Sequence, residues 1–95
     1  MAHKDTKRIG VRIEGRVQGV GFRWFVLREA QRLGLAGWVR NADDGAVEVR
    51  AEGAAAAIAR FELQLEHGPP AAQVMQLTQL PENNELLPAT FEITR

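Results

Sequence analysis

The stretch RIGVRIEGRVQGVGFR, residues 8–23, contains the features that decide how this chain folds. In its first half, Ile9, Val11 and Ile13 alternate with charged residues and glycine, which is the two-residue period of a strand with one buried face. In its second half, three glycines fall within residues 15–21. The stretch therefore predicts a strand that runs directly into a glycine-rich loop.

A helix is predicted immediately after this loop. Phe22, Val26, Ala30 and Leu33 recur at helical spacing, so they would form one buried stripe. Gly34 follows the last of them and is a natural C-terminal stop, because glycine readily takes the left-handed conformation that ends many helices.

The rest of the chain continues with strands and a second helix. A strand, a turn and a second alternating strand predict a β-hairpin. An alanine-rich helix follows and is ended by the sequence GPP, and two further strand candidates lie near the C-terminus. The predicted segments are a strand at 35–41, a turn at 42–45, a strand at 46–53, a helix at 54–67, and strands at 72–80 and 89–95.

The order of elements predicts the fold class. Strands and helices follow the pattern βαββαβ with an extra short strand, and a hairpin in the middle requires both helices to lie on one face of the sheet. We therefore expect an α+β, ferredoxin-like α/β sandwich with a largely antiparallel sheet of four to five strands. The 95 residues fit a single domain, 1–95, with a polar tail at 1–7 expected to be disordered.

Composition excludes several classes of protein. The chain has no cysteine, which removes disulfides and thiolate metal sites. It has no apolar run near the roughly 20 residues of a membrane span, and its start, MAHKDTKR, lacks the apolar block of a signal peptide. We expect a cytoplasmic protein without membrane contact.

Charge is distributed unevenly along the chain. Residues 1–40 hold 9 Lys/Arg and 3 Asp/Glu, whereas residues 41–95 hold 3 and 9. Such asymmetry can indicate nucleic-acid binding, but many of these charges fall at alternate strand positions or on helix faces, which indicates a solvated surface. The predicted central strands also lack the aromatic residues of an RNA-binding sheet, since Trp24 and Trp38 lie elsewhere. No nucleic-acid partner is expected.

The glycine loop has the context of an anion site. A helix N-terminus exposes unpaired amides and the positive end of the helix dipole, and here a strand leads straight into it. Two nucleotide motifs are excluded, because no GK[ST] is present and Trp24 replaces the third glycine of GxGxxG. From the glycines alone, a plain connecting turn remains an equal interpretation.

Arg23 and Asn41 favour the anion site. A cation in the first helical turn opposes the dipole by about 0.3–1 kcal/mol, and a bound phosphoryl group would explain it by accepting two guanidinium hydrogen bonds. Arg16 adds weaker support, because solvated loop arginines are common. Asn41 ends the strand after the helix, where asparagine is an ordinary turn residue, but the split topology would bring it to the same pocket, able to hold a water.

Other polar residues indicate structure rather than chemistry. His3 lies in the predicted tail, and His67 lies in the last helical turn, where a cation is favourable. Neither has a carboxylate or second histidine at ligand spacing, so no metal or other cofactor is expected. Asp43 and Asp44 are interpreted as turn residues rather than an acid/base pair.

The motifs GRVQGVGFR, GWVRN, DGAVEV, AEG, GPPAAQV and FEITR, with their spacing, resemble the acylphosphatase family from about Arg8 to Arg95. The resemblance implies metal-independent hydrolysis of small acyl phosphates to a carboxylate and inorganic phosphate. It implies Arg23 and Asn41 as catalytic residues. It also implies a phosphate-binding loop, which comprises Arg16, Val17, Gln18, Gly19 and Val20 together with Arg23.

Two alternatives remain open at this point. A ferredoxin-like module could bind a small anion or contact RNA without turnover. The chain also resembles the acylphosphatase-like segment of larger carbamoyl-transfer proteins, an interpretation that its end at Arg95 disfavours. A monomer is expected, although an edge strand leaves pairing open.

Overall fold

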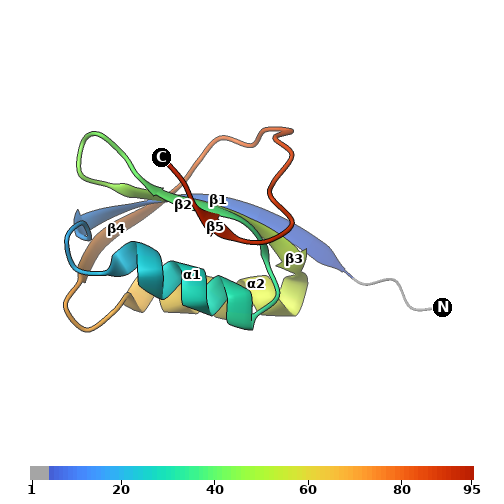
Figure 1. Cartoon of the computed structure of the whole chain (residues 1–95), viewed down its shortest axis with the longest axis horizontal. Helices are drawn as coiled ribbons and strands as arrows, with labels where there is room; N and C mark the ends of the chain where they lie inside the picture. Colours follow the sequence, from blue (N-terminus) through green and yellow to red (C-terminus); the bar gives the residue numbers. More distant parts are fainter. Residues whose placement is uncertain (1–4) are drawn as a thin grey trace.

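The structure, a computed structural model, describes residues 5–95 and consists of a five-stranded sheet with two helices packed on one face (Figure 1). The strand order is β4-β1-β3-β2-β5. Four strands pair antiparallel, and the short β5 pairs parallel with β2. The predicted ferredoxin-like class is confirmed. The elements are β1 Thr6–Arg16, α1 Phe22–Arg32, β2 Ala36–Asn41, β3 Val47–Ala54, α2 Ala55–His67, β4 Gln73–Gln79 and β5 Glu92–Ile93.

The register of the central strands determines which residues meet at the end of the sheet. Ile13 of β1 pairs with Val47 of β3, and Val47 also pairs with Asn41 of β2. Because β1 and β2 are both antiparallel to β3, they run in the same direction and finish at the same end of the sheet. The loop that follows β1 and the turn that follows β2 are therefore neighbours in space.

The core lies between the sheet and the helices, as the hydrophobic periodicity predicts. Val11 and Ile13 of β1 are buried at 2% and 0% exposure. The α2 stripe of Ile58, Phe61 and Leu65 is fully buried, and the Phe61 ring packs edge-on against Phe91 with centroids 6.1 Å apart. This packing covers one face of the sheet and fixes α1 and α2 on it.

The first helix ends close to its predicted stop. The last helical residue is Arg32, and Leu33 is the cap. Gly34 adopts a φ of 71° and donates to the Gln31 carbonyl, while the Leu35 amide donates to Ala30 at 2.9 Å. This is the paired hydrogen-bond pattern of a Schellman motif, which requires a left-handed residue.

The prediction of a disordered tail at 1–7 is wrong for Thr6 and Lys7. These residues begin β1 and pair with Ala54 and Gly53 of β3. Their side chains are polar, so the hydrophobic pattern did not extend to them. Strand pairing at these positions is made by backbone hydrogen bonds, which the sequence does not show. Residues 1–4 lie outside the described part of the chain.

Ion pairs on the face of the sheet opposite the helices explain the uneven distribution of charge along the chain. Arg12 of β1 and Arg40 of β2 both contact Glu48 of β3, at 3.6 and 2.8 Å. Arg8 contacts Glu52 in the same way at 3.5 Å. The basic first half thus pairs with the acidic second half across the sheet, which supports the solvated-surface interpretation. In the described chain, neither helix is long and apolar enough to cross a membrane.

Candidate active site

The loop between β1 and α1 turns sharply because of two glycines. Gly19 and Gly21 have φ values of 75° and 79°, a left-handed conformation that side chains rarely adopt. Beyond the neighbouring residues of the chain, no atom lies within 4 Å of a Cβ placed on either glycine, so backbone conformation rather than crowding requires them. Val17 is buried at 1% exposure and anchors the start of the loop in the core. The result is a fixed turn whose outer side faces open space.

The N-terminus of α1 has unpaired backbone donors. Gly21 is the N-cap residue and provides no side-chain cap, and the first turn contains no acidic residue. The Phe25 amide makes the first helical bond, to the Gly21 carbonyl at 3.0 Å. The amides before Phe25 therefore have no acceptor within the helix, and the positive end of the dipole is not neutralised by a side chain. Such a helix end favours an anion.

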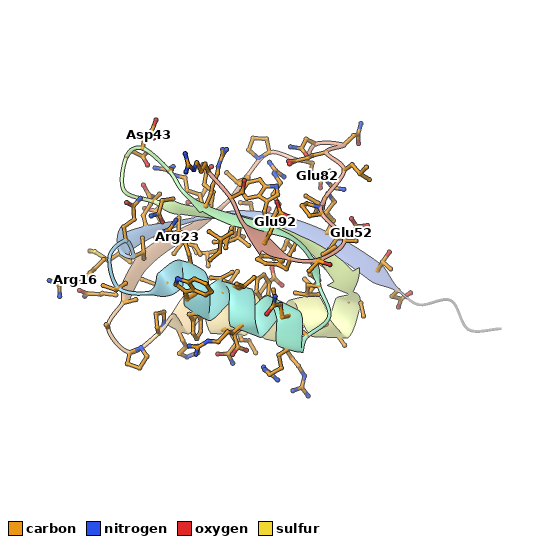
Figure 2. All side chains as sticks on the ribbon, in the orientation of Figure 1. Arg16, Arg23, Asp43, Glu52, Glu82 and Glu92 are labelled. Atoms are coloured by element: carbon orange, nitrogen blue, oxygen red, sulfur yellow. The ribbon has the colours of Figure 1, made fainter. Side chains whose placement is uncertain are left out.

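Arg23 lies in this first turn without a partner. It is half-buried, and within residues 5–95 it makes no ion pair and no side-chain hydrogen bond, whereas Arg12, Arg40 and Arg50 are all paired. In the view of Figure 2, Arg23 lies between α1 and the β2–β3 hairpin, while Arg16 extends away from the fold. The two candidate arginines therefore differ, and Arg23 is the one held at the helix end.

Asn41 is the last residue of β2 and lies at the same end of the sheet. Asn41 pairs with Val47, which also pairs with the inward-facing Ile13. Because paired residues point to the same side of a sheet, Asn41 lies on the face that the helices cover. Its Oδ1 is buried and has no hydrogen-bond partner within the described chain. A buried amide oxygen without a partner is costly in a folded protein, and a bound water would satisfy it.

The side chain of Gln18 joins the loop to the hairpin. Its Nε2 donates to the carbonyls of Ala42 and Ala46, at 2.9 and 3.0 Å. The Ala42 amide also donates to the Ala46 carbonyl at 2.8 Å, which closes the turn. Since Ala42 follows Asn41 directly, the phosphate-loop candidate and the asparagine candidate are connected through two hydrogen bonds.

These residues converge at one end of the sheet, but not through adjacent strands. The strand of Asn41 does not pair with β1, because β3 lies between them, as the predicted split topology implies. Asn41 also lines a hollow of about 360 Å³ with Arg40, Asp43 and Arg95, in which Arg23 takes no part. The candidate site is therefore the region between the start of α1 and the hairpin, at the end of the sheet where β1 and β2 finish.

The acylphosphatase family model matches residues 9–93 of this chain. The chain belongs to the acylphosphatase family. "Acylphosphatase 2" of Ralstonia nicotianae is 46% identical over 89 residues, which cover 94% of each chain. The acylphosphatase of Paraburkholderia xenovorans is 45% identical over 82 residues, which cover 86% of this chain and 84% of the relative.

Solved structures similar to this chain include a member of the same family. A crystal structure of acylphosphatase from Bacillus subtilis has a TM-score of 0.85 and 39% identity, and the match covers 93% of this chain and 98% of that one. Full-length HypF, in a phosphate- and nucleotide-bound form, has a TM-score of 0.81 and 27% identity, covering 99% of this chain but 12% of that chain. The sequence identity is higher to the Bacillus subtilis acylphosphatase than to HypF.

The weaker candidates have structural roles in this acylphosphatase domain. His67 is exposed, and its Nδ1 lies 2.8 Å from the Leu63 carbonyl in the last turn of α2. Asp44 accepts a hydrogen bond from the Ala46 amide, and the Arg12 guanidinium beside it lowers the pKa of the Asp44 carboxyl. No cluster of three potential metal ligands occurs among residues 5–95. His3 lies outside the described residues.

Sequence reasoning missed the role of the Gln18 side chain. The sequence placed Gln18 in the phosphate-binding loop, but its amide group faces the hairpin, which leaves only its backbone amide for an anion. The acceptors are backbone carbonyls 24 and 28 residues further along the chain. No side-chain type identifies such acceptors, so a single sequence carries no signal for this contact.

Proposed function

We propose that this protein hydrolyses the carboxyl–phosphate bond of small acyl phosphates, giving a carboxylate and inorganic phosphate without a metal ion or other cofactor. The observation that carries the proposal is the half-buried Arg23, which has no partner among residues 5–95 and lies beside unpaired amides at the start of α1. The family membership supports the same activity.

The phosphoryl group binds between the loop and Arg23 in this proposal. Backbone amides of Val17, Gln18, Gly19 and Val20 face its oxygens, and the Arg23 guanidinium donates two parallel hydrogen bonds to it. The exposed Arg16 contributes through its field rather than through a fixed contact. The bound anion supplies the negative charge that both the positive helix end and Arg23 lack.

The chemistry of an acyl phosphate suits such a site. The leaving group is a carboxylate, whose conjugate acid has a pKa near 4, so it departs without protonation by a general acid. Phosphoryl transfer passes through a loose transition state with charge on the equatorial oxygens, and fixed donors stabilise that charge. A site with Arg23, amides and no histidine is therefore sufficient.

Asn41 orients the attacking water. Its buried, unpartnered Oδ1 accepts a hydrogen bond from the water, which directs a lone pair of the water oxygen toward phosphorus. The new P–O bond forms as the bond to the acyl oxygen breaks, and the carboxylate leaves with the bonding electron pair. The proton of the water passes to a phosphoryl oxygen of the substrate.

Hydrolysis of acetyl phosphate and benzoyl phosphate in excess EDTA tests the activity. We expect turnover by the wild type that EDTA does not change, and loss of both turnover and phosphate binding in Arg23→Ala. Phosphate binding without turnover in the wild type would instead favour a small-anion-binding module. Loss of activity in EDTA, restored by a divalent cation, would contradict the metal-independent mechanism.

The state of the protein in the cell is part of the proposal. We propose that the protein is cytoplasmic. We also propose that it is a monomer, because the open face of the sheet is occupied by internal ion pairs and one edge strand, β5, has only two residues. Light scattering should give a mass near 10.5 kDa. A mass of twice that value would contradict the monomer.

A further inference from the structure

We propose that Gln18 is a positioning residue, whose side chain holds the β2–β3 hairpin, and with it Asn41, at a fixed distance from the phosphate-binding loop. The inference rests on the proposed function and adds a role for a side chain that the family resemblance places only in the loop. The side chain itself contacts neither the phosphoryl group nor the water.

The first argument is that both donors of the Gln18 amide are used. A primary amide nitrogen has two hydrogens, and Nε2 of Gln18 lies 2.9 Å from the Ala42 carbonyl and 3.0 Å from the Ala46 carbonyl. These two oxygens stand at the two ends of the hairpin turn. The Gln18 side chain thus binds both ends of the turn, and neither of its amide hydrogens is available to a ligand.

The second argument is that Gln18 makes the hydrogen bonds between residues 17–21 and the hairpin turn, although Arg12 of β1 also pairs with Asp44 of that turn. Within the described chain, the one turn, loop or cap backbone hydrogen bond that involves residues 17–21 runs from the Phe25 amide to the Gly21 carbonyl, at the start of α1. A Cβ placed on Gly19 or Gly21 would meet no atom within 4 Å beyond the neighbouring residues of the chain. The buried Val17 fixes the start of the loop, and Gln18, the next residue, makes the polar connection to the hairpin.

The third argument is geometric. Asn41 and the loop belong to strands that do not pair, because β3 lies between β1 and β2. Their separation therefore depends on sheet twist and on the conformation of the turn. Misplacement of a reacting group by about 1 Å can cost about 100-fold in rate, so a direct bond from the loop to the residue after Asn41 has a clear mechanistic use.

The test is a split between turnover and phosphate binding. Gln18→Met keeps the length of the side chain and removes both donors. We expect kcat with benzoyl phosphate to fall by about tenfold, less than the about 100-fold cost of a misplacement of about 1 Å, and the inhibition constant of inorganic phosphate to change less than about twofold. Gln31→Met, on the exposed side of α1, is the matched control and should leave both values unchanged.

A double-mutant cycle identifies the residue through which Gln18 acts. In an Asn41→Ala background, Gln18→Met should cause no further loss of kcat, because the group that it positions is gone. A full tenfold loss in that background, or a rise in the phosphate inhibition constant equal to the fall in kcat, would overturn the proposal. Should Gln18→Met fail to fold, Gln18→Asn, which keeps the amide but shortens its reach, is measured in the same way.

The outcomes separate this inference from the proposed function. A wild type that hydrolyses benzoyl phosphate together with an unaffected Gln18→Met would overturn the role of Gln18 alone. A wild type without turnover would overturn the proposed function, and the positioning role with it.

Discussion

Replacing Arg23 with glutamine should make the unliganded protein more stable while it removes phosphate binding. Arg23 lies two residues after the N-cap Gly21, in a turn that has no acidic residue, and it has no partner within the described chain. A cation at such a position costs about 0.3–1 kcal/mol, and glutamine has a similar helix propensity. The free energy of unfolding should rise by this amount.

The expected shift is measurable by thermal unfolding. For a domain of this size, 1 kcal/mol corresponds to about 4–8 °C in Tm, so Arg23→Gln should unfold about 1–8 °C higher than the wild type in phosphate-free buffer. Arg28→Gln is the matched control, because Arg28 lies in α1 beyond the first turn and is exposed. It should change Tm by much less than the Arg23 substitution.

Phosphate should reverse the order of stability. A ligand at 100 times its dissociation constant stabilises the native state by about 2.7 kcal/mol, so the wild type should become the more stable protein, whereas Arg23→Gln should show no phosphate-dependent rise. A variant that is less stable than the wild type without phosphate would show that Arg23 supports the fold. Equal stabilisation by phosphate in both proteins would refute its role in anion binding.

Three further substitutions test the fold and the turn. Phe61→Ala should cost about 3–5 kcal/mol in chemical denaturation, because it leaves a cavity against Phe91 in a fully buried cluster; a loss below 1 kcal/mol would contradict the packing. Gly21→Ala should cost about 1–2 kcal/mol from backbone strain alone, since φ is 79° and no atom crowds the Cβ; wild-type stability would contradict it. Asp44→Asn should destabilise the protein at pH 7 and not at low pH: the pKa of Asp44 is lowered by Arg12, so its contribution is present above the ordinary value of 3.8 and lost as the pH falls through the native pKa. An unchanged difference in acid would argue against the ion pair.

The elements could be predicted from the sequence because each follows from a local pattern. The alternation of Ile9, Val11 and Ile13 and the helical spacing of Phe22, Val26 and Ala30 reflect burial on one face, which the structure confirms. The same local chemistry indicated the anion site, since glycines before a helix and an arginine in its first turn are features of neighbouring residues.

What the sequence could not predict depends on contacts between distant backbone groups. Thr6 and Lys7 join β1 through main-chain pairing with β3, which leaves no trace in their polar side chains. The bonds of Gln18 to two hairpin carbonyls belong to the same class, because every residue has a carbonyl.

The segment between β4 and β5 shows the same limit. Residues 81–88 have turn chemistry, yet they also pack onto the sheet: the Arg50 guanidinium donates to the Pro81 carbonyl at 2.8 Å, and Trp38 Nε1 donates to Glu85 at 2.8 Å. Arg50 is consequently buried at 8% exposure. A charged residue in the middle of an alternating strand indicates an exposed position, and only the folded chain shows what covers it.

Comparison of Asn41→Ala with the wild type tests the central claim most directly. The measurement is kcat for benzoyl phosphate in excess EDTA, with the inhibition constant of inorganic phosphate determined on the same samples. If Arg23 and the loop bind the phosphoryl group while Asn41 orients the water, kcat should fall by at least about 100-fold and the inhibition constant should stay within about twofold. Normal turnover with a large loss of phosphate binding would contradict the account.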